Sequence, residues 1–150
     1  MTFIAEKDPG LIPQILSKIL DSSVNGITLA DPDLEDMPLV YVNKAFLKMT
    51  GYKMEEVVGK NCRFMQGEDR EQKERYIMQD AIKNKQPVEV TFKNYRKNGE
   101  LFFNHLEMTP LFDSSGKLLY YLGVQLDVTQ KVRAEEEIKR LNQLLKSGGE

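Results

Sequence analysis

The sequence has few of the residues that build disulfide and metal sites. It contains one cysteine, Cys62, and one histidine, His105. A single cysteine excludes an intramolecular disulfide framework, and with a single histidine it also excludes the usual zinc cages of Cys and His ligands. His105 is not a convincing haem or metal ligand, and we expect it on a surface or at an interface. The prediction is a protein without a metal.

An excess of charge and a long apolar run are lacking too. The net charge is −2 and the pI is near 5.6, so no bulk electrostatic field attracts nucleic acid or anionic lipid. No apolar run approaches the ~18 residues of a membrane span, and the first ten residues lack the pattern of a secretory signal. We therefore expect a cytoplasmic protein without nucleic-acid or membrane partners. No Ser/His/Asp set, phosphate loop or paired-carboxylate site is evident, which argues against an enzyme.

What is present predicts one globular domain with helical extensions. The chain has 150 residues, of which 41% are hydrophobic and 29% charged. Residues 1–22 include an amphipathic helical segment with Leu11, Ile15 and Ile19 on its apolar face. Residues 23–128 read as the core, and residues 129–150 as a coiled-coil-like helical extension.

The core has the pattern of an α+β fold. Strands are expected at 26–30, 38–42, 87–96, 101–112 and 117–128, and helices at 44–49, 54–57 and 70–83. Asn98-Gly99 is a strong hairpin signal between the third and fourth strands. The order predicts a five-stranded antiparallel sheet with helices on one face.

Two asparagines fall on apolar faces of the predicted strands. Asn94 ends the face of Val90 and Phe92, and Asn104 lies within an apolar stripe on the next strand. Burying an unpaired amide costs about 1–3 kcal/mol. These amides therefore bond to each other, to nearby backbone, or to a polar ligand.

The last strand leaves both of its faces as candidates for burial. Alternation alone selects one set as the core, namely Leu118, Tyr120, Leu122, Val124, Leu126 and Val128. The other face carries Gly123 and Gln125 beside Tyr121, which suits a surface that touches a flat ligand. One face would lie inside the domain and the other beneath a terminal helix or a partner.

The most specific stretch is GKNCRFMQG, residues 59–67. A lone cysteine on a short helix is usually inert filler. Here Arg63, Arg70 and Arg75 accompany it, and arginines at such intervals either converge on a phosphate or are solvated. The residues alone indicate an anion site near a thiol.

This stretch resembles the flavin motif of the light-oxygen-voltage (LOV) branch of the PAS superfamily. The resemblance extends through DPDLEDMPLVYVNKAF and MTGY upstream and KNYRKNGELFFN and LGVQLDVT downstream, and it covers residues 27–129. The chain is most similar to short bacterial LOV proteins, which have a core and helical extensions. The resemblance implies a PAS/LOV fold and a blue-light photoreceptor that binds FMN. The alternatives are a light-independent PAS-type ligand or thiol redox sensor, and a scaffold module with a degenerate pocket.

The resemblance also implies roles for individual residues. Cys62 would bond to the flavin C4a carbon after illumination, and Gln125 would contact N5 and O4 and turn when N5 is protonated. Asn94 and Asn104 would bind the polar edge of the ring. Gln66 and Asn61 would help to hold the ribityl chain and the ring, and the phosphate would contact Arg63, Arg70 and Arg75. The remaining lining residues would be Thr28, Ala30, Asn43, Leu106, Leu122 and Gly123.

The chain departs from the family pattern at two positions. Met65 replaces the usual leucine, a volume-matched change, and Phe103 replaces a common tryptophan on the outer face. No inserted loop follows Gly67, which favours FMN over FAD. We also expect a homodimer through the terminal helices and the outer face of the sheet, with an effector protein as a further partner.

Overall fold

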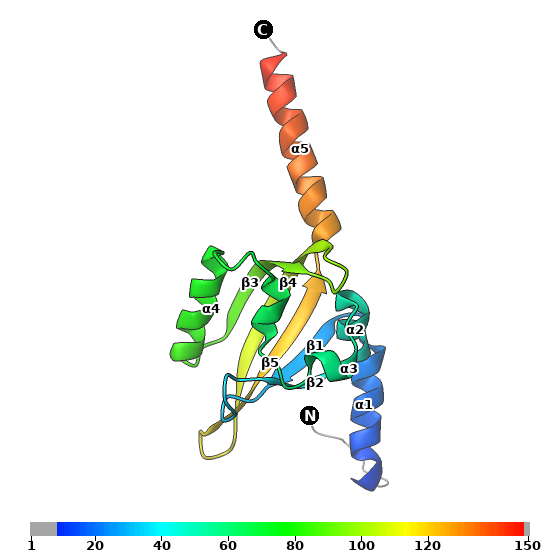
Figure 1. Ribbon diagram of the computed structural model, residues 1–150, viewed down its shortest axis with the longest axis vertical. Helices are drawn as coiled ribbons and strands as arrows, with labels where there is room; N and C mark the ends of the chain where they lie inside the picture. The colour runs from blue at the N-terminus through cyan, green and yellow to red at the C-terminus, as the bar shows by residue number, and fades with distance from the viewer. Residues whose placement is uncertain (1–8, 149–150) are drawn as a thin grey trace.

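A twisted antiparallel sheet forms the centre of the molecule, as a computed structural model shows for residues 9–148 (Figure 1). Its strands lie in the order β2-β1-β5-β4-β3. They span Gly26–Ala30 (β1), Leu39–Val42 (β2), Val88–Tyr95 (β3), Leu101–Phe112 (β4) and Leu118–Asp127 (β5). The predicted five-stranded α+β architecture is therefore confirmed. The strand at 101–112 has the predicted bounds, and Asn98-Gly99 lies in the turn that joins it to β3.

Helices cover one face of this sheet (Figure 1). They are α2 (Lys44–Thr50), α3 (Met54–Val57), the 3-10 helix η2 (Cys62–Gln66) and α4 (Lys73–Lys83). α4 begins three residues later than predicted, because Gln72 binds the edge of the sheet instead of entering the helix. The Gln72 side chain accepts from Lys93 N at 2.8 Å and donates to Lys93 O at 2.8 Å. This side chain extends the edge of β3 and holds the residue in an extended conformation.

The buried face of β5 is the opposite of the one that alternation selected. Tyr121 and Gln125 are each 2% exposed and Gly123 is also buried, whereas Leu126 is 46% exposed and Leu122 is half-buried. Of the two candidate faces, the more apolar one is therefore the outer one, so apolar content alone did not identify the inward face. Here the inward face is partly polar, and it borders a cavity under the helices.

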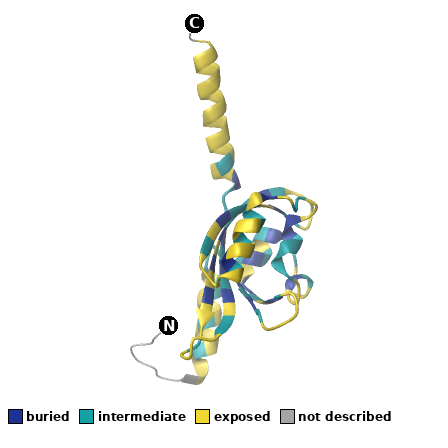
Figure 2. Ribbon diagram, turned by 90° about the vertical axis from the view of Figure 1, so that its left-hand side faces the viewer, coloured by how far each residue is buried: buried dark blue, intermediate teal, exposed yellow. Residues whose placement is uncertain are grey.

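Two helices flank the core at the chain ends. After a 3-10 turn (η1, Pro9–Leu11), α1 spans Ile12–Ser22, and α5 spans Thr129–Ser147. α5 projects away from the sheet, and nearly all of its length is exposed (Figure 2). Residues 1–8 and 149–150, which belong to the predicted extensions, lie outside the described part of the chain. None of the described helices is long and apolar enough to cross a membrane.

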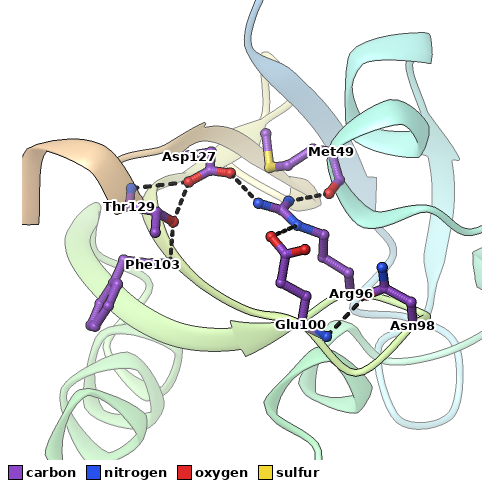
Figure 3. Close-up of polar contacts among 7 residues, drawn as sticks. All are labelled: Met49, Arg96, Asn98, Glu100, Phe103, Asp127 and Thr129. Atoms are coloured by element: carbon purple, nitrogen blue, oxygen red, sulfur yellow. Dashed lines mark hydrogen bonds and ion pairs between the residues drawn. The ribbon is translucent and has the colours of Figure 1, made fainter. Parts of the chain in front are cut away.

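A polar cluster fixes the base of α5 (Figure 3). Arg96 donates to Asp127 Oδ2 at 2.7 Å and to the carbonyl of Met49 at 2.5 Å. The other carboxylate oxygen of Asp127 accepts from Thr129 N at 3.0 Å, and Thr129 Oγ1 accepts from Phe103 N at 2.9 Å. Because these bonds join α2, β4 and the end of β5, they define where α5 leaves the core.

Candidate functional site

A cavity lies between the inward face of the sheet and the helices η2 and α4. Residues of β1, β3, β4 and β5 line it on the sheet side, and residues of η2 and α4 line it on the helix side. Its walls combine apolar side chains with a limited set of polar ones. Such a lining suits a flat, largely apolar ligand with polar edges.

Cys62 begins the short helix η2 on one wall of this cavity. Asn61 caps the helix, because its Oδ1 accepts from Arg63 N at 3.0 Å. The helix ends at Gly67, where a φ of 56° and a Cβ only 3.3 Å from the Tyr95 ring would strain any other residue. Burial raises the pKa of the Cys62 thiol, although the Arg63 charge opposes this effect. The thiol is therefore protonated at neutral pH and weakly reactive on its own.

A chain of side-chain amides crosses the floor of the cavity on three neighbouring strands. Asn104 Nδ2 donates to Asn94 Oδ1 at 2.9 Å and to Gln125 Oε1 at 3.1 Å. Gln125 Nε2 in turn donates to Thr28 Oγ1 at 3.1 Å. All four side chains are at most 5% exposed. The two asparagines thus bond to each other, yet Asn104 Oδ1 remains without a partner.

Gly123 is required for this arrangement. An added Cβ would lie 2.5 Å from Thr28 Oγ1, closer than side-chain atoms approach in proteins. The two residues are register partners on β5 and β1. The glycine therefore admits the Thr28 hydroxyl that holds Gln125.

Four buried polar atoms have no hydrogen-bond partner among the described residues, and all four belong to residues that line this cavity. They are Gln66 Oε1, Arg70 Nε, Arg75 Nε and Asn104 Oδ1. Leaving a buried polar group unsatisfied costs about 1–3 kcal/mol, so such a set in one cavity points to a polar ligand. Amide acceptors on one side and arginine donors on another fit a flavin ring with a phosphorylated side chain.

Most of the residues predicted for the site line the cavity. They are Thr28, Ala30, Asn61, Cys62, Arg63, Gln66, Arg70, Arg75, Asn94, Asn104, Leu106, Gly123 and Gln125. Two residues do not. Leu122 pairs with Leu29 on the opposite face of the sheet, as the alternation of β5 requires.

Asn43 has a structural position instead of a site in the cavity. Its Oδ1 accepts from Ile27 N and Phe46 N at 2.8 and 3.1 Å, and its Nδ2 donates to the carbonyls of Leu20 and Asn25 at 2.8 and 3.0 Å. These bonds cap α2 and connect it to β1 and the end of α1. The amide has no hydrogen-bonding capacity left for a ligand.

Sequence reasoning missed the contribution of α4. Met78, Gln79 and Ile82 from this helix line the cavity, as does Met37 from the loop before β2. The helical spacing of Met78 and Ile82 was the available signal, but it is equally typical of ordinary core packing.

His105 lies outside the cavity, on the outer face of β4. Its ring nitrogens lie 2.9 Å from Thr91 Oγ1 and 2.6 Å from Glu89 Oε1. Glu107 brings a third potential ligand atom to this half-exposed group. Both ring nitrogens of His105 therefore have hydrogen-bond partners within the chain.

The PAS domain family profile matches residues 24–130. A blue-light photoreceptor of Listeria innocua is 37% identical over 126 residues, which are 84% of this chain and 49% of that protein. The chain thus spans about half the length of this relative.

Solved structures of light-oxygen-voltage proteins are also similar to this chain. An RNA-binding light-oxygen-voltage receptor is 35% identical with a TM-score of 0.84, and the match covers 95% of this chain and 40% of that one. The LOV domain of a blue-light-activated histidine kinase from Erythrobacter litoralis is 47% identical with a TM-score of 0.66, over 70% of this chain and 96% of that domain. Because one relative binds RNA, the low net charge is no argument against a nucleic-acid partner. The profile match, the identities and the shared fold show that this chain belongs to the PAS domain family, in its LOV branch.

Proposed function

We propose that this protein is a blue-light photoreceptor that binds FMN and forms a reversible bond between Cys62 and the flavin. The main support for this proposal is that Cys62 and the residues of the four unpartnered polar atoms line one cavity. Asn94, Asn104 and Gln125 would bind the polar edge of the ring, and the arginines the phosphate. The flavin supplies the light-absorbing ring and an electrophilic carbon, C4a, when excited.

On illumination, Cys62 would supply its S–H group to the excited ring. The sulfur would bond to C4a and the thiol proton would go to N5, so the addition would need no external oxidant or reductant. The raised pKa supports this role, because the thiol keeps its proton in the dark. It also disfavours the alternative of a redox-sensing thiolate. Return of the proton to sulfur would restore the starting state, so no substrate would be consumed and the chain would act as a sensor.

Gln125 would pass the change in N5 to the sheet. Once N5 carries a proton, the amide must present its oxygen there, which reverses its donor and acceptor atoms. Thr28 can meet either orientation, since a hydroxyl both donates and accepts. Asn104 cannot, because its Nδ2 would then face the Nε2 of Gln125. If Asn104 turned as well, its oxygen would accept from Gln125 but would face Asn94 Oδ1, so the Asn94 amide would have to turn with it.

The signal would reach a homodimer through the terminal helices and the outer face of the sheet. Ile15 and Ile19 on α1 are 42% and 46% exposed, and Leu126 on β5 is 46% exposed. On α5, Ile138 and Leu141 are 59% and 46% exposed. A second copy of the chain would cover these apolar groups, and light would change the packing between the copies. A separate effector protein is the alternative partner.

Absorption spectra before and after blue illumination test the proposal. We expect the flavin absorption of the purified chain to bleach and to recover in the dark. Cys62→Ala should retain the flavin and remain fluorescent without bleaching. Cys62→Ser is the matched control, because it keeps the size of the side chain and removes the sulfur. A colourless protein, or bleaching that persists in both variants, would refute the assignment.

A further inference from the structure

Two arginines of the predicted phosphate site have acidic partners: Arg75 pairs with Glu71 at 3.3 Å, and Arg63 pairs with Asp36. Arg63 lines the cavity, and its guanidinium pairs with the carboxylate of Asp36, from the loop that joins β1 and β2. The two side chains are 42% and 53% exposed. The hydrogen bond from Arg63 lowers the pKa of Asp36, so this carboxylate is charged at neutral pH.

The loop that carries Asp36 has a defined position. Asp36 and Met37 both adopt left-handed backbone, with φ of 64° and 47°, which is uncommon for residues other than glycine. Asn61 Nδ2 donates to the carbonyl of Asp36 at 2.8 Å, while its Oδ1 holds the backbone of Arg63. Asn61 therefore fixes Asp36 and Arg63 relative to each other. Met37 adjoins Asp36 and lines the cavity.

We propose that Asp36 is a specificity-determining residue that competes with the flavin phosphate for Arg63. It would thereby lower the preference of the cavity for a phosphorylated flavin over an unphosphorylated one. The inference rests on the proposed function, because it assumes that the cavity binds flavin. Arg70 and Arg75 still offer unpartnered Nε atoms, so the phosphate would keep donors when Arg63 is shared. The negative charge of Asp36 offsets part of the attraction for the phosphate.

A competition experiment on the full chain tests this role. The protein is equilibrated with an equal mixture of FMN and riboflavin, and the ratio of the two bound flavins is measured after denaturation. We expect Asp36→Asn to raise the FMN-to-riboflavin ratio about twofold to fivefold, the range that an exposed ion pair provides. Asp33→Asn is the matched control. It removes the same charge from the same loop, where Asp33 faces Lys117 at 3.9 Å, and it should leave the ratio unchanged.

A double variant tests whether Asp36 acts on the flavin ratio through Arg63. In Arg63→Gln, the further change Asp36→Asn should alter the ratio less than it does in the wild-type chain, since the two residues act as a pair. Asparagine tolerates left-handed backbone, and Asp36→Gly repeats the test if the first variant is unstable. An unchanged or lower ratio in Asp36→Asn, or an equal rise in Asp33→Asn, would overturn the inference. Wild-type protein that binds neither flavin would overturn the proposed function and the inference with it.

Discussion

Replacing Asn43 tests whether this residue supports the fold and not the cavity. The residue is 1% exposed, and Asn43→Ala removes its four hydrogen bonds to backbone groups. At about 1 kcal/mol for each bond, and with the partner groups left buried, we expect a loss of about 3–4 kcal/mol in the free energy of unfolding. A domain of this size has about 5–15 kcal/mol in total, so the variant should fold but be much less stable.

Urea unfolding followed by circular dichroism measures this loss. Asn98→Ala is the matched control, because Asn98 is exposed and accepts one hydrogen bond, from Glu100 N at 2.9 Å. That variant should lose no more than about 1 kcal/mol. The ratio of bound FMN to riboflavin should not change in folded Asn43→Ala, since the residue does not line the cavity. A loss below about 1 kcal/mol, or an altered flavin ratio, would refute the structural assignment of Asn43.

Two further predictions concern the sheet. Gly123→Ala should lower the free energy of unfolding, measured by urea denaturation, by about 1–3 kcal/mol, because the added Cβ displaces Thr28 Oγ1 from Gln125. Adding Thr28→Ala to this variant should recover part of the loss. An unchanged unfolding midpoint in Gly123→Ala would contradict the prediction. Burial alone would raise the pKa of Asp127, but hydrogen bonds from Thr129 and an Arg96 ion pair more than offset it, so its pKa is lowered. The stability from this group is therefore present above its unfolded pKa of about 3.9 and is lost as the pH falls below it. Unfolding curves from pH 5 to pH 2 should show a weaker pH dependence in Asp127→Asn, and parallel curves for the two proteins would count against it.

The strands and helices of the core were predictable because their signals are local. The Asn98-Gly99 turn determines the register of the neighbouring strands, and Asn94 and Phe102 pair across them as the hairpin requires. Gly51 ends α2 with a left-handed φ of 79°, as a glycine after a helix typically does. Such signals depend on adjacent residues and need no knowledge of the tertiary fold.

The inward face of β5 was not predictable by the same means. Alternation separates two faces but does not say which one meets the helices. The face with Gly123 and Gln125 is less apolar, and only the placement of Thr28 and Asn104 on neighbouring strands gives Gln125 its partners. The error for Leu122 follows directly, because a residue next to Gly123 must point the other way.

The same alternation places the buried Gln125 amide close in sequence to the residue that holds the start of the exposed helix α5. Gln125 and Asp127 are two residues apart on β5 and point to the same side of the sheet. Gln125 borders the cavity, while Asp127 holds Thr129 at the start of α5 and Arg96 against α2. In the proposed function, a turn of the Gln125 amide would change the hydrogen bonds at one end of this short segment, and α5 begins at the other end. Gln125 and the residue that holds the start of α5 are therefore two positions apart on one strand, so a shift in β5 would need no further element to alter how α5 leaves the core.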